Sequence, residues 1–177
     1  MRYLELRRHT LREPGNPHIS QRGLDLARRT GVGMGQFARI ISSPEPRAIE
    51  TAIAMGFAVD ELYEPVQCDM RKRQVRGIEK LLPYSLSFQQ RLAIAQDHKS
   101  TRRYLAALVS QWTKLAKRIP SGKSFLVISH GGYLEDSAIA CLPSANHRSW
   151  GANFGHCEGI RLTFNRGYFT SGQILRA

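Results

Sequence analysis

The fold is decided by one stretch near the start of the sequence, Tyr3-Leu4-Glu5-Leu6-Arg7-Arg8-His9-Thr10. Its first residues are typical of a β-strand, and a turn rich in proline, glycine and asparagine follows over 13–17. This order places Arg8 and His9 at the carboxyl end of the strand, where open α/β sheets bind ligands. An imidazole there can attack a phosphoryl group while the guanidinium holds its oxygens. On its own an Arg-His pair is more typical of a protein surface, so the rest of the chain must decide between that and phosphoryl chemistry.

Two further segments repeat the order of strand, polar cluster and helix. The β-rich run 37–41 ends in Ser42-Ser43-Pro44, and the helix predicted over 47–55 has Arg47 in its first turn. The apolar run 124–128 ends in Ser129-His130-Gly131-Gly132, before a helix predicted over 133–142. In a parallel sheet these strand ends share one rim, so two histidines and two arginines remote in sequence can converge. Because glycine lets backbone N–H groups approach an anion closely, the sequence predicts a phosphate pocket there.

The remaining patterns complete an α/β chain. Apolar spacing and capping residues predict three more helices and three more strands, over 20–31, 88–96 and 101–119, and over 59–63, 159–164 and 168–175. The region between, at about 65–99, begins with a polar, basic run and predicts a small excursion over the active site. We expect a single domain over 1–177, a three-layer α/β/α sandwich with a mostly parallel central sheet.

The charge of the chain bears on its partners. Lys and Arg number 26 against 14 Asp and Glu, which gives a formal net charge of +12. This charge favours an acidic partner, but the basic residues are scattered and match no nucleic-acid module. We therefore expect a phosphorylated small molecule or a phosphoprotein as partner, and no nucleic acid. No apolar run approaches the length of a membrane span, so no membrane partner is expected. The sequence predicts no oligomeric state.

The cysteines and the loop histidines bear on compartment and cofactors. The three cysteines, Cys68, Cys141 and Cys157, are an odd number without CxxC spacing, which favours reduced thiols and a cytoplasmic location. His147, His156 and Cys157 lie close in sequence, but their spacing suits no familiar zinc site. We expect neither a metal nor a cofactor.

The motifs resemble those of the histidine phosphatase superfamily, also called phosphoglycerate mutase-like. The resemblance is carried by segments in the family's order and at its spacing: Leu6-Arg7-Arg8-His9-Thr10, Ser42-Ser43-Pro44-Glu45-Pro46-Arg47-Ala48-Ile49-Glu50-Thr51-Ala52 and Val127-Ile128-Ser129-His130-Gly131-Gly132, with Ile19-Ser20-Gln21-Arg22-Gly23 between the first two. It implies that His9 is the nucleophile, phosphorylated and then hydrolysed in each turnover. It also implies that Arg8 and Arg47 bind the phosphoryl oxygens, and that His130 stabilises the transition state. Such a pocket needs no metal, because phosphoryl transfer depends mainly on positioning and charge.

The resemblance is weaker for the group that protonates the leaving oxygen. Relatives usually carry a glutamate in a Leu-x-Glu segment after the third strand, and Leu62-Tyr63-Glu64 fits that place. Glu64 is therefore the expected general acid, with Asp69 in reserve. Thr10 replaces the usual glycine after the first histidine, and we expect its hydroxyl to add a donor to the pocket. Gly131 argues against the acid phosphatase branch, which carries its proton donor as His-Asp at this place.

These inferences give a primary function and several alternatives. We expect a metal-independent phosphatase that hydrolyses phosphomonoesters, or phosphohistidine, through a phosphohistidine intermediate on His9. A phosphoglycerate-mutase-type phosphoryl transfer is the alternative within the family. Outside it, the same residues could form a non-catalytic module that binds phosphorylated ligands or nucleic acid. Hydrolysis of p-nitrophenyl phosphate in EDTA separates these hypotheses.

Overall fold

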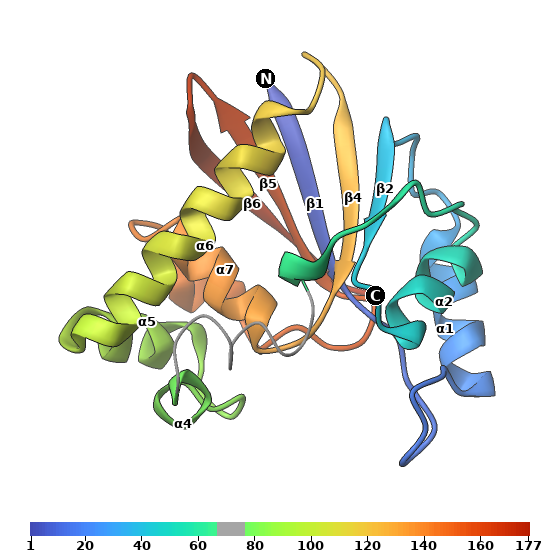
Figure 1. Ribbon diagram of the computed structural model, residues 1–177, viewed down its shortest axis with the longest axis horizontal. Helices are drawn as coiled ribbons and strands as arrows, with labels where there is room; N and C mark the ends of the chain where they lie inside the picture. The colour runs from blue at the N-terminus through green and yellow to red at the C-terminus, as the bar shows by residue number, and fades with distance from the viewer. Residues whose placement is uncertain (67–76) are drawn as a thin grey trace.

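One sheet forms the centre of the molecule (Figure 1). The computed structural model describes residues 1–66 and 77–177, and over these residues six strands join in the order β3-β2-β4-β1-β5-β6. The strands are β1 (Arg2–Arg8), β2 (Arg39–Ser42), β3 (Glu61–Leu62), β4 (Ser124–Ser129), β5 (Gly159–Asn165) and β6 (Tyr168–Leu175). Strands β1 to β4 are parallel, whereas β5 and β6 are antiparallel to their neighbours. The carboxyl ends of β1, β2 and β4 therefore meet at one edge.

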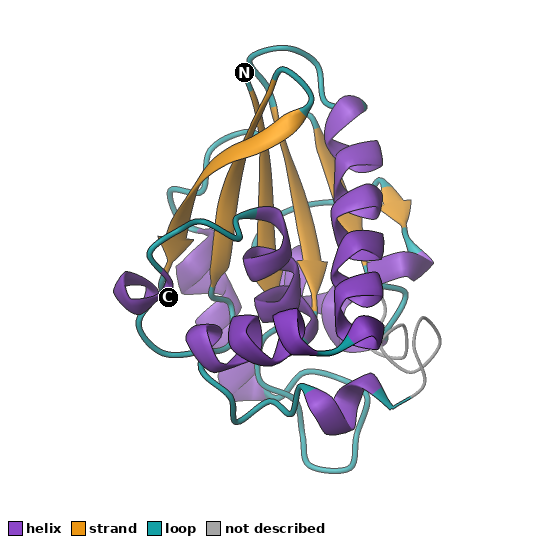
Figure 2. Cartoon of the chain, turned by 90° about the vertical axis from the view of Figure 1, so that its left-hand side faces the viewer, coloured by secondary structure: helices purple, strands orange, loops and turns teal. Residues whose placement is uncertain are grey.

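Helices cover both faces of this sheet (Figures 1 and 2). On one face, α1 (Gln21–Gly31) packs beside α2 (Pro46–Ala54). On the other face lie α5 (Phe88–Asp97), α6 (Lys99–Lys117) and α7 (Tyr133–Cys141). Three short elements complete the described chain: α4 (Ile78–Leu81) and the 3-10 turns η1 (Glu64–Val66) and η2 (His147–Trp150). The predicted three-layer α/β/α sandwich with a mostly parallel sheet is confirmed.

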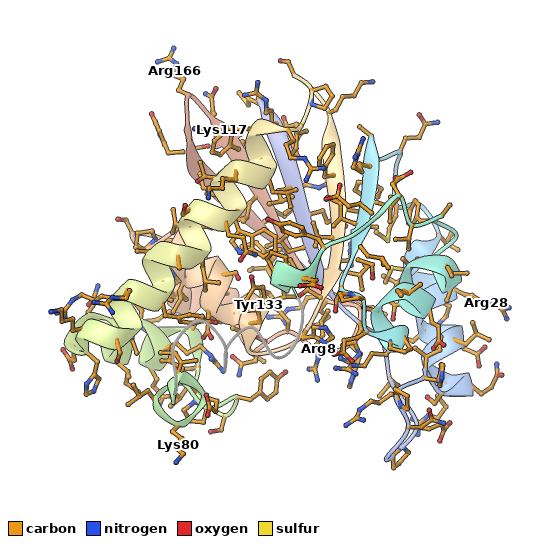
Figure 3. The ribbon with its side chains drawn as sticks, in the orientation of Figure 1. Arg8, Arg28, Lys80, Lys117, Tyr133 and Arg166 are labelled. Carbon is orange, nitrogen blue, oxygen red and sulfur yellow. The ribbon has the colours of Figure 1, made fainter. Side chains whose placement is uncertain are left out.

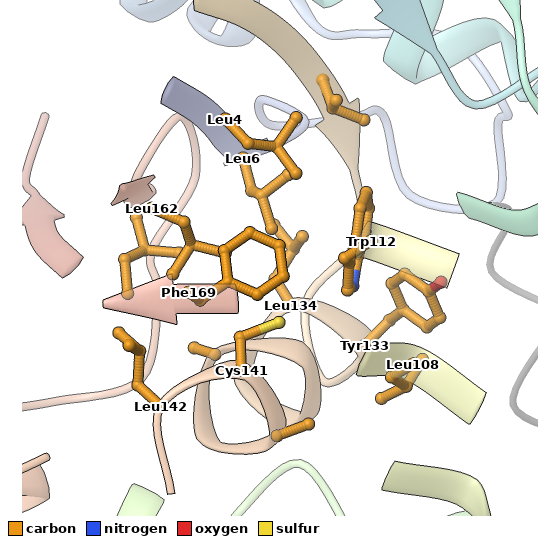
Figure 4. Close-up of a cluster of buried hydrophobic side chains, with 14 of the residues drawn as sticks. Leu4, Leu6, Leu108, Trp112, Tyr133, Leu134, Cys141, Leu142, Leu162 and Phe169 are labelled. Atoms are coloured by element: carbon orange, nitrogen blue, oxygen red, sulfur yellow. The ribbon is translucent and has the colours of Figure 1, made fainter. Parts of the chain in front are cut away.

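Alternation along the strands creates a core on each face. Leu4 and Leu6 of β1 point into the core under α6 and α7, where Trp112 is fully buried with them (Figure 4). Leu126 and Ile128 of β4 point the other way, into the core under α1 and α2. Because successive strand residues face opposite sides, a strand covered on both faces must be apolar throughout. This explains the uninterrupted apolar run that the sequence shows before His130.

The structure differs from the predicted elements mainly in the third strand and in helix α4. The third strand, predicted over 59–63, is reduced to Glu61–Leu62. The reason is that the Asp60 carboxylate accepts the Ile40 N–H at 2.7 Å, which replaces a strand carbonyl with a side chain. Helix α4 was not predicted, since its single turn after Gly77, at φ 85°, is too short for a periodic pattern. In the described parts of the chain, no helix combines the length and apolarity needed to cross a membrane.

A matched pair of leucines tests the assignment of the core. Leu6 is fully buried, whereas Leu62 is 55% exposed. Leu6→Ala should lower the free energy of unfolding by about 2–5 kcal/mol, because it removes buried methyl groups and leaves a cavity. Leu62→Ala should change it by less than about 0.5 kcal/mol. Urea denaturation followed by circular dichroism measures both, and equal losses would contradict the placement of Leu6.

Candidate functional site

The register of the parallel strands brings the two predicted histidines together. Arg8 pairs with Ser129 across β1 and β4, so His9 and His130 each follow directly after a paired residue. The His9 N–H also donates to the Ser129 carbonyl at 2.8 Å. As a result, the two imidazole rings lie with centroids 5.1 Å apart at an interplanar angle of 60°. Both side chains are buried, with residue exposures of 7% and 2%.

The hydrogen bonds of His9 determine which ring nitrogen can react. Its Nδ1 lies 2.7 Å from the carbonyl oxygen of Thr10, which can only accept a hydrogen bond. Nδ1 therefore carries the hydrogen, and Nε2 keeps the lone pair. The Nε–H of Arg47 donates to this Nε2 at 3.3 Å. His9 thus presents a nucleophilic nitrogen directly beside a guanidinium.

His130 is oriented by Ser43 and by the same arginine. Its Nε2 lies 2.8 Å from the Ser43 hydroxyl, and its Nδ1 accepts from Arg47 Nη2 at 3.4 Å. Since an arginine can only donate, Nδ1 holds a lone pair and Nε2 donates to Ser43. Ser43 is fixed in turn, because its N–H donates to the Ile128 carbonyl at 2.9 Å. The guanidinium of Arg47 thus bridges the two imidazoles.

Arg47 stands in the first turn of α2, as the sequence predicted. A cation is unfavourable at the positive end of a helix dipole. The carboxylate of Glu45, which precedes the helix, compensates by accepting from Arg47 Nη1 at 3.1 Å. An anion bound at this place would gain from both the helix terminus and the guanidinium.

Both pocket histidines are neutral over the physiological pH range. Burial, reinforced by repulsion from Arg47 and Arg8, lowers the pKa of His9 to about 3, although its bond to the Thr10 carbonyl acts in the opposite direction. Burial, with repulsion from His9 and the two arginines, lowers the pKa of His130 to about 2. A neutral imidazole retains the lone pair that nucleophilic attack requires.

Arg8 reaches the same edge from the end of β1 (Figure 3). Its Nη1 donates to the Tyr84 hydroxyl at 2.6 Å and to the Phe154 carbonyl at 2.9 Å, and its guanidinium lies 5.1 Å from the centre of the Tyr84 ring. Its Nε is buried and has no hydrogen-bond partner among residues 1–66 and 77–177. A buried N–H without a partner costs free energy, which an anion in the pocket would recover.

The backbone at Gly131 and Phe154 packs against Arg8 and fixes its position. A Cβ added at Gly131 would lie 2.9 Å from Arg8 Nε and 3.0 Å from the Tyr84 ring, so a larger residue would force these side chains to move. Four residues after Gly131, in the first turn of α7, the fully buried carboxylate of Glu135 accepts from the N–H groups of Gly132 at 2.5 Å and Phe154 at 2.9 Å. Glu135 therefore fixes the position of the Phe154 carbonyl that holds Arg8.

These side chains surround a hollow of about 280 Å³. Among the described residues, its lining combines three arginines, three histidines and one glycine: Arg8, His9, Arg12, Arg47, His130, Gly131 and His156. A lining with three cations and no carboxylate suits an anion. A larger hollow of about 550 Å³ lies between the end of α7 and β6, but the described residues that line it include no charged side chain.

Two of the predicted site residues lie away from this hollow. Thr10 is fully buried, and its hydroxyl donates to the Gly23 carbonyl at 2.9 Å, so the prediction that it adds a donor to the pocket is wrong. Its N–H donates instead to Thr51 Oγ1, which ties β1 to helix α2. Glu64 is exposed on η1 and is not among the described residues that line the hollow. Asp69, the reserve, lies outside the described residues.

Three residues that the structure brings to the site are not among the predicted site residues. Arg12 and His156 line the hollow, and Tyr84 holds Arg8. Arg12 could have been predicted to reach the hollow, because it lies only three residues after His9. His156 was noted only as part of a metal-like trio with His147 and Cys157, but His147 packs on Trp150 with ring centroids 4.4 Å apart. The described residues contain no cluster of His, Cys, Asp or Glu suited to a metal ion.

Comparison with known proteins supports the fold. No protein-family model and no curated protein matches the chain. Among solved structures, the phosphoserine phosphatase of Entamoeba histolytica, in complex with 3-phosphoglyceric acid, is 18% identical with a TM-score of 0.71, covering 100% of this chain and 98% of that one. The chain has the phosphoglycerate mutase-like fold.

Two further solved structures share this fold. A mycobacterial glucosyl-3-phosphoglycerate phosphatase, determined with VO3, is 17% identical with a TM-score of 0.59, and all of each chain is covered. Phosphoglycerate mutase from Bacillus anthracis is also 17% identical, with a TM-score of 0.60, over 95% of this chain and 90% of that one. The fold expected from the histidine phosphatase resemblance is thus confirmed, and it is shared by phosphatases and a mutase.

Gly131→Ala tests the support of Arg8. The added methyl group would push the guanidinium away from the hollow, so we expect phosphate or vanadate to bind roughly 10- to 100-fold more weakly, the loss typical of a misplaced site group. Gly35→Ala is the matched control, since a Cβ there meets nothing within 4 Å. Isothermal titration calorimetry measures both variants. Unchanged anion affinity in Gly131→Ala would show that Arg8 does not depend on this glycine.

The pH dependence of stability tests the burial of the histidines. The folded protein keeps His130 uncharged, whereas the unfolded chain binds a proton as the pH falls below about 6.5. Stability should therefore decrease as the pH falls from 7 to 4, by up to about 1.4 kcal/mol per pH unit for each such histidine. His130→Gln removes one such histidine, so the slope of stability against pH should become smaller by up to about 1.4 kcal/mol per pH unit. Urea denaturation over this pH range provides the measurement, and parallel curves for the two proteins would refute the prediction.

Proposed function

We propose that the protein is a phosphatase of the histidine phosphatase type, which hydrolyses phosphomonoesters through a phosphohistidine on His9. The observation that supports this most directly is the pair of neutral imidazoles bridged by Arg47, with the Nε2 lone pair of His9 facing the guanidinium. A nucleophile beside preset cationic donors is what phosphoryl transfer requires, because its transition state gains mainly from in-line positioning and charge stabilisation.

In the proposed reaction, the two histidines and two arginines of the predicted pocket act together. His9 Nε2 attacks phosphorus and forms the phosphohistidine, and water then hydrolyses the P–N bond. Arg47 and Arg8 hold the phosphoryl oxygens, since both guanidiniums line the hollow. His130 is uncharged, is held by Ser43, and lines the same hollow, where it orients Arg47 by accepting from its Nη2. The arginines supply the positive charge, so we propose a metal-independent reaction.

The proposed substrate is a phosphorylated small molecule. Two solved neighbours were determined with 3-phosphoglyceric acid or with VO3, and both are phosphatases by name. A phosphoprotein, including phosphohistidine, remains a proposal for the same open hollow. Figure 3 shows Arg28 at the right, Lys80 at the bottom and both Lys117 and Arg166 at the upper left, so these cations are not gathered on one side, and we propose no nucleic-acid partner. We further propose that the chain is one functional domain. Because Cys141 and Cys157 are free, buried thiols, we also propose a reducing compartment such as the cytoplasm.

Hydrolysis of p-nitrophenyl phosphate in the presence of EDTA tests the proposed function. We expect turnover that is lost by at least about 10³-fold in His9→Ala, because the covalent route is removed. His98→Gln is the control, since His98 is exposed and lies outside the described lining of the hollow. Rapid acid-free quenching should capture a phosphoenzyme that is labile to acid and absent in His9→Ala. Activity that survives in His9→Ala, or that EDTA abolishes, would disprove the proposal.

The same assay addresses the alternatives. The phosphoglycerate mutase of Bacillus anthracis shares this fold. If this chain were a mutase, the phosphoryl group on His9 would pass to an acceptor molecule instead of being released as phosphate. Measuring free phosphate against isomerised phosphoglycerate separates the two reactions. Tight phosphate binding without turnover of any ester would instead favour a non-catalytic binding module.

A further inference from the structure

When a phosphate ester is cleaved, the leaving oxygen needs a proton. None of the described residues that line the hollow has yet been assigned as the donor of this proton. This question rests on the proposed function, because an ester with a poor leaving group departs slowly as a bare alkoxide. We infer that His156 is the general acid that protonates the leaving oxygen when His9 is phosphorylated, and the general base that activates water in the second step.

The other residues around the hollow are excluded by their chemistry. The three lining arginines stay protonated at all relevant pH values and cannot deliver a proton. His9 is the nucleophile, and its Nδ1–H is engaged by the Thr10 carbonyl. His130 donates through Nε2 to Ser43 and accepts through Nδ1 from Arg47. Among the described lining residues, His156 is the titratable side chain whose two ring nitrogens have no hydrogen-bond partner.

The loop that carries His156 is held firmly against the nucleophile. The Arg8 N–H donates to the Glu158 carbonyl at 2.8 Å, and the Cys157 N–H donates to the Arg8 carbonyl at 3.1 Å. Cys157 has a φ of 62°, uncommon for a residue other than glycine, and this turn directs the chain immediately after His156. The rings of His156 and His9 consequently lie with centroids 6.0 Å apart. Both rings also line the same hollow, so a phosphoryl group bound there would lie within reach of each of them.

The charges that face His156 make its protonation depend on the bound anion. Among the described residues these are the guanidinium of Arg8 and the imidazole of His9, while Arg12 lines the same hollow. Burial and repulsion from Arg8 lower the pKa of His156 to about 4. A phosphoryl dianion beside Arg8 offsets that repulsion and attracts a proton, so substrate binding raises this pKa towards the working pH. A donor with a pKa near the working pH is the most effective one.

The proton balance closes over the two steps. In the first step the bond from His9 Nε2 to phosphorus forms, the bond from phosphorus to the ester oxygen breaks, and that oxygen takes the proton of the His156 imidazolium to leave as an alcohol. In the second step the neutral imidazole of His156 takes a proton from water, whose oxygen bonds to phosphorus while the P–N bond breaks. Phosphate is released, His9 regains its lone pair and His156 is protonated again.

A comparison of leaving groups tests this role. In His156→Gln, kcat/KM for an alkyl ester such as glycerol phosphate should fall by roughly 10²-fold or more. With p-nitrophenyl phosphate, whose leaving group needs no proton, the loss should be at least tenfold smaller. The decrease in alkyl ester turnover with rising pH should also disappear in this variant, and imidazole added to His156→Ala should restore part of the activity. His98→Gln serves as the control for histidine loss at the surface.

The competing donors are tested in the same assay. Glu64→Gln and Asp69→Asn should leave the ratio of alkyl to aryl ester turnover close to that of the unsubstituted protein. A selective loss of alkyl ester turnover in either of these variants, but not in His156→Gln, would overturn the inference. An equal loss with both esters in His156→Gln would overturn it too, because it would show a structural role only. If the unsubstituted protein turns over neither ester, the proposed function itself fails, which is a distinct result.

Discussion

The site depends on the parallel pairing of β4 between β1 and β2. In this register Arg8 is level with Ser129 and Ser42 with Ile128, so three chain segments leave the sheet at the same height. A slip of one residue would move each side chain to the other face of the sheet and separate the two imidazoles. The register is fixed by the two apolar cores, because an interior strand must satisfy both faces at once. Packing far from the chemistry therefore sets the geometry of the histidines.

The electrostatics of the hollow follow from this geometry. Burial removes water from two imidazoles and places them among guanidiniums, and both influences favour the uncharged ring. Each of the two arginines is held in place by partners of its own. Glu45 balances Arg47, and Arg8 is held by the Tyr84 hydroxyl and the Phe154 carbonyl. The result is an uncharged His9 imidazole that keeps its Nε2 lone pair beside two guanidiniums.

Much of this arrangement could be predicted from the sequence. The three strand ends and the convergence of His9, His130, Arg8 and Arg47 followed from hydrophobic patterns and from the rule that parallel strands end on one rim. Side-chain direction could not be predicted in the same way. Thr10 lies next to His9 in sequence, yet its hydroxyl donates to the Gly23 carbonyl of α1, because the chain has already left β1 and no longer follows the alternation of a strand.

The role of the late loop was hidden from the sequence for a different reason. His156 reaches the hollow only because its loop pairs with Arg8, a contact between segments almost 150 residues apart that no local pattern encodes. Tyr84 is a similar case, since it approaches Arg8 from the region before α5. Glu64 was assigned from its place in a family motif, but the short third strand leaves it on the surface.

The buried carboxylate of Glu135 has a consequence for anyone who would move this site to another scaffold. It never faces the hollow, yet it clamps the start of α7 to the segment whose carbonyl steadies Arg8. A graft limited to the side chains that line the hollow would omit Glu135 and leave the Arg8 guanidinium without a fixed position. The smallest transferable unit therefore includes the backbone at Gly132 and Phe154 together with the buried Glu135 carboxylate that joins them.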